Sequence, residues 1–319
     1  MSAAIAATRV AHCNVNCSSL ERSRSFYEDV VGLTAFTHTN PPLQHAGGFP
    51  LSPPGPVVQW DAWMMHDDRG PAGSPALDLL EWKTPAPTGR AYPSANHLGY
   101  GRLTYVVPSV DEVFARCNAA GAAVLSAPTS VSLDATGTPK TRSFCALDPD
   151  GTCLEFVGHP TVPHTRASCV NVNCTDLGRS SAFYRDTLGL VQVDHLAPGP
   201  QSGSVFGLPG ECVWEAHVLS LPGQEDVFTV TLVEWKLPAA AGPPYATANN
   251  LGIFRMALMV ADIEASYEIL QGSGVSCPGG PVKLDMGPDV PIDGLWALFF
   301  ADPDGTCLEL IEEPTTGRR

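Results

Sequence analysis

Two glutamates lie inside strand-like segments of this 319-residue chain, and each follows the same run of residues. Glu155 ends the run Asp148-Pro149-Asp150-Gly151-Thr152-Cys153-Leu154-Glu155, and Glu309 ends an identical run at 302–309. Each copy predicts an Asp-Pro-Asp-Gly turn that leads into a strand. A carboxylate in a buried strand needs a charged partner, a ligand or water, because an unpaired buried charge is unfavourable. Both glutamates are therefore candidates for a binding or catalytic site.

Two further pairs of charged residues are separated by nearly the same number of residues as Glu155 and Glu309. Glu81 matches Glu234, and Arg102 matches Arg255. Two carboxylates in one enclosed pocket push their pKa values apart, so that one of them can act as a general acid or base. An arginine beside them would either neutralise the carboxylates or hold a substrate carboxylate or enolate.

The segment 10–17 predicts a strand with three polar side chains on one face. Strand alternation places His12 beside Asn14 and Asn16. The segment 168–174 repeats this face as Cys169, Asn171 and Asn173. Three polar groups on a buried face indicate either a hydrogen-bonded core network or a substrate-binding surface.

Aromatic residues form the remaining candidates for ligand contact. Trp60 and Trp63 correspond to Trp214 and His217, counted back from Glu81 and Glu234. Such side chains suit a flat organic ligand if they line a cavity, and ordinary core packing is the alternative. His97, which precedes a predicted strand, is a candidate proton shuttle or a solvated loop residue.

The elements that must position these residues form a repeating unit of a strand, a helix and several strands. The expected strands and helices of the first half are strands 10–17, 57–66, 76–83 and 98–107 and helices 19–31 and 110–120. A loop rich in Pro, Gly and His at about 37–56 is long enough to be a binding loop or lid.

The unit occurs twice before residue 158, and the pattern then restarts, with Phe183-Tyr184 matching Phe26-Tyr27. The sequence therefore predicts two tandem domains of two modules each. The expected bounds are 8–158 (modules at about 8–85 and 96–158), a linker at 159–166, and 167–313 (modules at about 167–238 and 249–313).

The amino-acid composition argues against several classes of protein. A formal net charge of −15, without any cluster of Lys and Arg, argues against nucleic acid and anionic membranes as partners. No apolar run approaches the roughly 20 residues of a membrane span, and no signal peptide is evident. The ten cysteines are scattered, which favours free thiols in a reducing cytoplasm.

These motifs resemble the vicinal oxygen chelate superfamily, which includes glyoxalase I, extradiol dioxygenases and bleomycin-binding proteins. The matching pieces are His12-Cys13-Asn14-Val15-Asn16-Cys17, Phe26-Tyr27 with Gly32-Leu33, and Asp-Pro-Asp-Gly before Leu-Glu. The resemblance implies an α+β fold with four βαβββ modules, in which the two modules of each half enclose one pocket.

The resemblance also implies where a metal would bind, since metal-dependent members take ligands from the first and last strands of each module. Carried over by position, the first half offers His12, Glu81, Arg102 and Glu155, and the second half offers Cys169, Glu234, Arg255 and Glu309. Arginine stands where the family has histidine or glutamine, and a guanidinium does not ligate metals. We therefore expect no cofactor, with Fe, Mn, Ni or Zn on His12, Glu81 and Glu155 as the alternative.

Three functions follow from this resemblance. The first is an enzyme for non-redox acid–base chemistry of lyase or isomerase type on a small, anionic or aromatic molecule. Its catalytic residues would be His12, Glu81, Arg102 and Glu155, with the better site in the first half. The alternatives are a metal-free protein that sequesters a small molecule and a metal-dependent lyase or dioxygenase. A monomer or a homodimer is expected.

Overall fold

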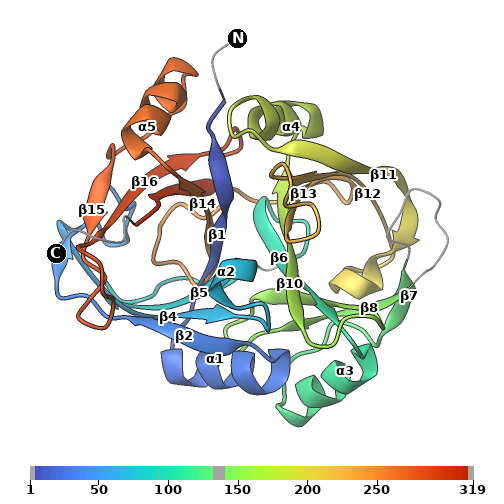
Figure 1. The fold of residues 1–319 in the computed structure, drawn as a ribbon. Coiled ribbons are helices and arrows are strands. Elements are labelled where there is room, and N and C mark those ends of the chain that lie inside the picture. The colour runs from blue at the N-terminus through green and yellow to red at the C-terminus, as the bar shows by residue number, and fades with distance from the viewer. Residues whose placement is uncertain (1–3, 93, 132–140, 315–319) are drawn as a thin grey trace.

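The computed structural model describes residues 4–92, 94–131 and 141–314, which form two curled β-sheets side by side with the longer helices outside them (Figure 1). The first sheet has nine strands in the order β15-β16-β17-β14-β1-β5-β4-β2, with β3 paired to β4. The second sheet has eight strands in the order β11-β12-β13-β10-β6-β9-β8-β7. This architecture confirms the α+β class and the four modules.

The strands and helices have the following bounds. The first sheet consists of β1 (Ala7–Asn16), β2 (Thr34–Thr39), β3 (Gln44–His45), β4 (Val57–His66), β5 (Ala76–Thr84), β14 (Gly252–Val260), β15 (Val282–Leu284), β16 (Leu295–Ala301) and β17 (Cys307–Glu312). The second consists of β6 (Gly99–Val107), β7 (Thr129–Val131), β8 (Thr141–Leu147), β9 (Cys153–Gly158), β10 (Arg166–Cys174), β11 (Val191–Ser202), β12 (Glu211–Ser220) and β13 (Thr229–Leu237). The helices are α1 (Leu20–Phe26), α2 (Gly70–Gly73), α3 (Val110–Ala119), α4 (Leu177–Asp186) and α5 (Ile263–Gly272), with short turns η1 (Tyr27–Val31) and η2 (Gly203–Phe206).

The modules pair across the two halves of the chain. β1 of the first module pairs antiparallel with β14 of the fourth, and β6 of the second pairs antiparallel with β10 of the third. The prediction that the two modules of each half enclose one pocket is therefore wrong. Each module pairs its first and last strands in parallel and leaves the other edge of its first strand open. Because the repeats are alike, β6 and β14 are both first strands of the kind that could pair with this edge of β1, and in the structure β14 is the partner.

The outer helices begin at side-chain caps and bury one face. In α1, the hydroxyl of Ser19 accepts a hydrogen bond from the backbone N–H of Arg22, and Leu20 and Phe26 are buried. The helical segment runs through η1 and ends at Gly32, whose φ of 92° lies in the left-handed region that glycine adopts without strain. The predicted helix 19–31 is thus present, with its last turn widened.

The Asp-Pro-Asp-Gly turns are held by their buried first aspartates. One carboxylate oxygen of Asp148 accepts hydrogen bonds from the backbone N–H groups of Asp150 (2.9 Å) and Thr152 (2.7 Å). The other accepts the hydroxyl of Tyr27 at 3.1 Å. Burial outweighs these hydrogen bonds and raises the pKa of Asp148 to about 6, and the same balance raises the pKa of Asp302 to about 6.

Replacing Asp148 by asparagine should flatten the dependence of stability on pH. A carboxyl whose pKa is higher in the folded than in the unfolded state stabilises the protein at low pH, and this contribution is lost as the pH rises from about 4 to 6. In the wild type, we expect this carboxyl to lower the free energy of unfolding by about 1–3 kcal/mol over that interval, and Asp148→Asn should remove this decrease. The amide oxygen of asparagine still accepts hydrogen bonds from the turn, so the fold should be kept. Urea unfolding at pH 4, 5, 6 and 7 measures this, with the exposed Asp111→Asn as control. A wild-type slope in Asp148→Asn would contradict the expectation.

All ten cysteines are free thiols, in agreement with the prediction from their spacing. No helix in the described residues has the length and apolar character needed to span a membrane.

Candidate functional site

Four charged or titratable side chains meet inside the first sheet, one from each of its four central strands. They are His12 of β1, Asp78 of β5, Arg255 of β14 and Glu309 of β17, and all four are buried. Strand register explains the meeting, because His12 lies opposite Ala257 in β14 and Ala257 lies beside Glu309 in β17. We call these four residues the buried cluster.

Arg255 joins the two carboxylates of the buried cluster. Its Nη2 donates to Oδ2 of Asp78 at 2.9 Å, and its Nε donates to Oε2 of Glu309 at 2.7 Å. The imidazole Nε2 of His12 lies 3.1 Å from Oε2 of Glu309 and 3.8 Å from Oδ2 of Asp78. With two anions, one permanent cation and one imidazole, the buried cluster has a net charge of −1 or 0, depending on His12.

The pKa of Glu309 reflects this environment. Burial raises the pKa of the carboxyl, but the charge of Arg255 and the hydrogen bonds from His12 and Arg255 more than offset burial and lower it overall. The pKa of Arg255 is correspondingly raised, since Glu309 and Asp78 outweigh its burial. Glu309 is therefore an anion at neutral pH, suited to orienting an imidazole and stabilising its protonated form.

Two polar atoms of the site have no hydrogen-bond partner in the part of the chain that the structure describes. They are Nη1 of Arg255 and Oδ1 of Asn14. Asn14 uses its amide nitrogen to donate to Oδ2 of Asp78 at 3.1 Å. A buried guanidinium nitrogen without an acceptor is unfavourable, and an anionic group of a ligand would satisfy it.

Apolar and aromatic side chains form the walls of a cavity that the buried cluster lines. The other lining residues are Thr39, Phe49, Trp60, Met64, Leu80, Trp82, Leu284, Met286 and Leu295. Phe49 comes from the long loop between β2 and β4, and its ring centroid lies 5.4 Å from that of Trp82 and 5.9 Å from the guanidinium carbon of Arg255. The loop expected as a lid thus places an aromatic ring over the buried cluster.

The second sheet carries a reduced version of the same arrangement. Arg102 Nε donates to Oε2 of Glu155 at 2.8 Å, and the hydroxyl of Thr104 donates to the same oxygen. The positions that match His12 and Asp78 are Cys169 and Thr231, whose sulfur and hydroxyl lie 3.0 Å apart. One ion pair replaces the fourfold cluster, so the second sheet lacks an imidazole at this position.

The structure therefore regroups the predicted residues. His12 shares its site with Arg255 and Glu309 of the other half, whereas Arg102 and Glu155 lie in the other sheet. The expectation that His12, Arg102 and Glu155 line one pocket is wrong, because the modules pair across the halves.

Glu81 and Glu234 lie away from both sheet interiors. The carboxylate of Glu81 accepts the backbone N–H of Leu20 at the start of α1 at 2.8 Å and contacts Lys83. Glu234 does the same for Leu177 at the start of α4, at 3.0 Å, and contacts Lys236. Both glutamates complete helix N-termini, and the prediction that Glu81 acts beside His12 is wrong.

Replacing Glu81 by alanine should lower the stability of the protein without changing the cavity that the buried cluster lines. The substitution removes an acceptor from the N-terminus of α1, so we expect the free energy of unfolding to fall by about 0.5–1 kcal/mol. Chemical denaturation measures this, with Glu234→Ala as the matched variant in the other half. Loss of ligand binding in Glu81→Ala at unchanged folding would show instead that Glu81 belongs to the site.

Strand alternation separates the predicted aromatic pairs. Trp60 lines the cavity, whereas Trp63 lies outside the sheet, stacked on His38 at 4.6 Å. Trp214 packs in the interior of the second sheet, and His217 bonds to Ser181 of α4 on the outside. Positions three apart in a strand lie on opposite faces, so neither pair could share one surface.

The remaining predicted residues have structural partners. Asn16 and Asn173 each donate to two backbone carbonyls of the loops that connect the sheets, and their side-chain oxygens accept from Trp82 and Trp235. Asn171 donates to Thr104, and His97 stacks on Tyr92 in a connecting loop. None of these four residues lines the cavity beside His12.

Sequence reasoning missed Asp78, although a signal was present. In the segment 76–83, alternation places Asp78 on the same face as Leu80 and Trp82, opposite Glu81. The repeated Glu-Trp-Lys motif favours Glu81 instead, and Asp78 has no counterpart in the second half because Thr231 stands at the matching position.

The donor types of the buried cluster include those that divalent metals use, but Arg255 makes the set unfit. His12, Asp78 and Glu309 supply imidazole and carboxylate donors. The guanidinium of Arg255 already occupies one oxygen of each carboxylate, at 2.9 and 2.7 Å. A divalent ion on the same oxygens would be repelled by this permanent cation.

Comparison with known proteins gives the following matches. The family model "Glyoxalase/Bleomycin resistance protein/Dioxygenase superfamily" matches residues 9–156 and again 161–310. The fold resembles glyoxalase I from Zea mays, at 16% identity and a TM-score of 0.64 over 95% of this chain and 92% of that one. It also resembles a putative dioxygenase from Bacillus subtilis, at 14% identity and a TM-score of 0.58 over 98% of this chain and 87% of the other. No curated protein matches the sequence.

Proposed function

Since the chain belongs to the Glyoxalase/Bleomycin resistance protein/Dioxygenase superfamily, we propose that it is an enzyme for a small organic anion, acting in the cavity of the first sheet. The reaction is non-redox acid–base chemistry of lyase or isomerase type. The observation that carries the proposal is Nη1 of Arg255, a buried donor without a partner in the described residues. A carboxylate or enolate oxygen of the substrate is the group that this donor would bind.

In the proposed reaction, Nδ1 of His12 takes a proton from the substrate and returns it to the product, since Nε2 faces Glu309. Its Nε2 lies within 3.1 Å of Glu309, which orients the imidazole and stabilises its cationic form when it takes a proton from the substrate. Arg255 then faces the negative charge that develops on the substrate, which is the electrostatic role that contributes most in many enzymes. Asp78 holds the guanidinium in place from the other side.

The proposed substrate is small and flat. The rings of Phe49, Trp60 and Trp82 line the cavity, and such rings favour planar or apolar groups next to the anionic end. Entry requires that the loop carrying Phe49 move, because this ring covers the guanidinium of Arg255.

A metal-free binding protein is the second candidate. The same aromatic walls and the same unpartnered donor would retain an anionic ligand without chemistry. The two functions differ in one property, which is whether a bound ligand is converted.

The test is a thermal-shift screen of small aromatic and carboxylate-bearing compounds, followed by mass spectrometry of each ligand after incubation with enzyme. The proposed enzyme raises its melting temperature with at least one such anion and converts it. Binding without conversion would support the sequestering function. Elemental analysis of untagged protein that finds stoichiometric Fe, Mn, Ni or Zn, lost in His12→Ala, would overturn the metal-free chemistry.

A further inference from the structure

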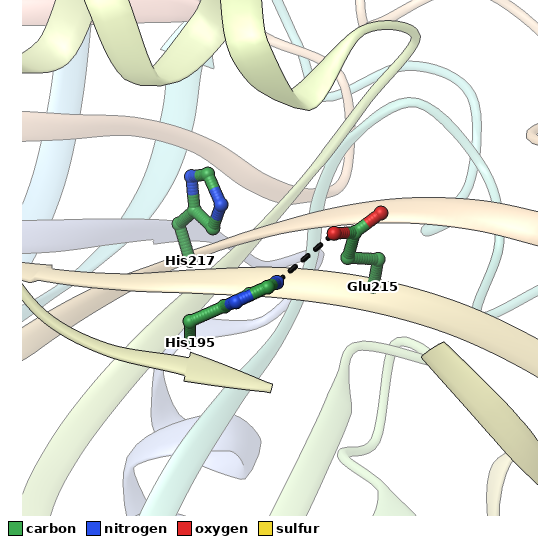
Figure 2. Close-up of side chains that lie close together, drawn as sticks. All are labelled: His195, Glu215 and His217. Carbon is green, nitrogen blue, oxygen red and sulfur yellow. Dashed lines mark hydrogen bonds and ion pairs between the residues drawn. The ribbon is translucent and has the colours of Figure 1, made fainter. Parts of the chain in front are cut away.

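A second group of donors lies on the outer side of the second sheet, away from the buried cluster. His195 of β11 and Glu215 and His217 of β12 place one donor atom each within 4.8 Å of one another (Figure 2). It is the one such group of three among residues 4–92, 94–131 and 141–314. His195 and His217 are direct partners across the two antiparallel strands, and Glu215 lies two positions before His217. All three therefore project from one face of the same ribbon.

The rings of this group are already oriented by their neighbours. The Nδ1 of His217 hydrogen-bonds to the hydroxyl of Ser181, a buried residue of α4, at 2.5 Å. In the tautomer whose Nδ1–H donates to that oxygen, Nε2 of His217 keeps the lone pair that a metal ion needs. The Nε2 of His195 lies 2.9 Å from Oε1 of Glu215 (Figure 2). A hydroxyl that orients one imidazole and a carboxylate beside a second imidazole are features of a prepared metal site.

We propose that His195, Glu215 and His217 bind one divalent transition-metal ion of the Zn²⁺, Co²⁺, Ni²⁺ or Cu²⁺ class. Two imidazoles and a carboxylate, without thiolates, suit these ions and not Ca²⁺ or Mg²⁺, which prefer oxygen ligands. The side chain of His195 is 46% exposed, so water completes the coordination. Lys236 approaches only the other oxygen of Glu215, at 3.6 Å, and pairs more closely with Glu234.

The bound ion joins β11 to β12 through side chains. β11 is an edge strand whose residues are mostly exposed, and its partner within the sheet is β12. A metal bridge between His195 and His217 therefore stabilises this exposed edge of the sheet. This role is independent of the reaction proposed in the first sheet.

The first half of the chain supplies an internal control. There, the matching positions are His38, Asp61 and Trp63. The Nε2 of His38 lies 2.6 Å from Oδ1 of Asp61, but Trp63 stands where the second imidazole would be and stacks on His38. The histidine–carboxylate pair is thus present in both halves, but at the matching positions only the second half has a second imidazole. In the first half, Nδ1 of His38 lies 3.2 Å from a second carboxylate, that of Asp289.

Calorimetric titration of chelator-treated, untagged protein with ZnCl₂ and with NiCl₂ tests the proposal. We expect one equivalent to bind, no measurable binding at this site in His217→Trp and His195→Ala, and unchanged binding in His38→Ala. Ser181→Ala should weaken the affinity by about 10- to 100-fold, because the hydroxyl orients the ligand. Circular dichroism confirms that each variant is folded.

Amide hydrogen exchange is a second measurement of the same site. Addition of ZnCl₂ should slow exchange in β11 of the wild type, but not in β11 of the folded His217→Trp variant. Trp63→His should add a second equivalent in the other half. Equal binding by the wild type and His217→Trp, or no binding by the wild type, would overturn the proposal.

Discussion

Arg255→Met is expected to lower the free energy of unfolding by about 3–5 kcal/mol, because it leaves two buried carboxylates without their cation. Arg255 donates to Asp78 at 2.9 Å and to Glu309 at 2.7 Å, and both acids are at most 2% exposed. Urea denaturation at pH 7 measures the loss. The variant should also be destabilised least at acid pH, where the two carboxylates become protonated and no longer need a partner.

Two matched variants separate the charge effect from lost packing. Arg102→Met in the second sheet leaves only one carboxylate without its cation, that of Glu155, whose side chain is 12% exposed. It should therefore lower the free energy of unfolding less than Arg255→Met does. Adding Asp78→Asn and Glu309→Gln to Arg255→Met should recover part of the stability, since neutral amides replace the unpaired charges. If Arg255→Met were as stable as the wild type at pH 7, the buried cluster would not be the paired network described.

His12→Gln is expected to reduce turnover of an identified substrate by about 10²- to 10⁴-fold while largely preserving affinity. Glutamine keeps a side-chain amide near Glu309 but cannot accept and release a proton at neutral pH. Steady-state kinetics separate the two effects, because a lost proton transfer lowers kcat and leaves the anion contact of Arg255 intact.

Cys169→Ala is the control for this prediction. Cys169 occupies the position in the second sheet that His12 occupies in the first, beside Thr231 instead of Asp78. Turnover should be unchanged in Cys169→Ala if the chemistry belongs to the first sheet. A loss of kcat in Cys169→Ala with wild-type kcat in His12→Gln would assign the reaction to the second sheet.

The sequence repeat was enough to predict the modules and most of their elements. The copied Asp-Pro-Asp-Gly runs predict where β9 and β17 begin, and polar alternation places His12, Asn14 and Asn16 on one face of β1. These signals are local, since a turn motif and a strand period depend on residues near in sequence.

The pairing of modules could not be predicted from the same signals. β6 and β14 are repeats of one another, so each offers β1 an equivalent edge. The choice of β14 is made by contacts between distant segments, such as the hydroxyl of Tyr100 in β6, which bonds to the backbone of Met256 and of Cys307 in the other sheet. The site that contains His12 therefore includes Arg255 and Glu309 instead of the expected Arg102 and Glu155.

The difference between Asp78 and Glu81 depends on which face of β5 each side chain occupies. Two residues three apart in β5 cannot share a face, and Trp82 already indicated which face is buried. The repeated Glu-Trp-Lys motif favours Glu81 as the site residue, whereas the strand period favours Asp78. A residue repeated in both halves, such as Glu81 and Glu234, has a role that both halves share, here as a carboxylate at a helix N-terminus. Residues of a site that is present in only one half, such as His12 and Asp78, are not repeated.

A crystal structure of the protein with the best ligand from the anion screen would show whether Arg255 and His12 form the site. We expect an acidic oxygen of the ligand within about 3 Å of Nη1 of Arg255, with His12 facing the reacting carbon and the Phe49 loop displaced or closed over the ligand. A ligand bound beside Arg102 in the second sheet, or a metal ion on His12, Asp78 and Glu309 with Arg255 turned away, would contradict it.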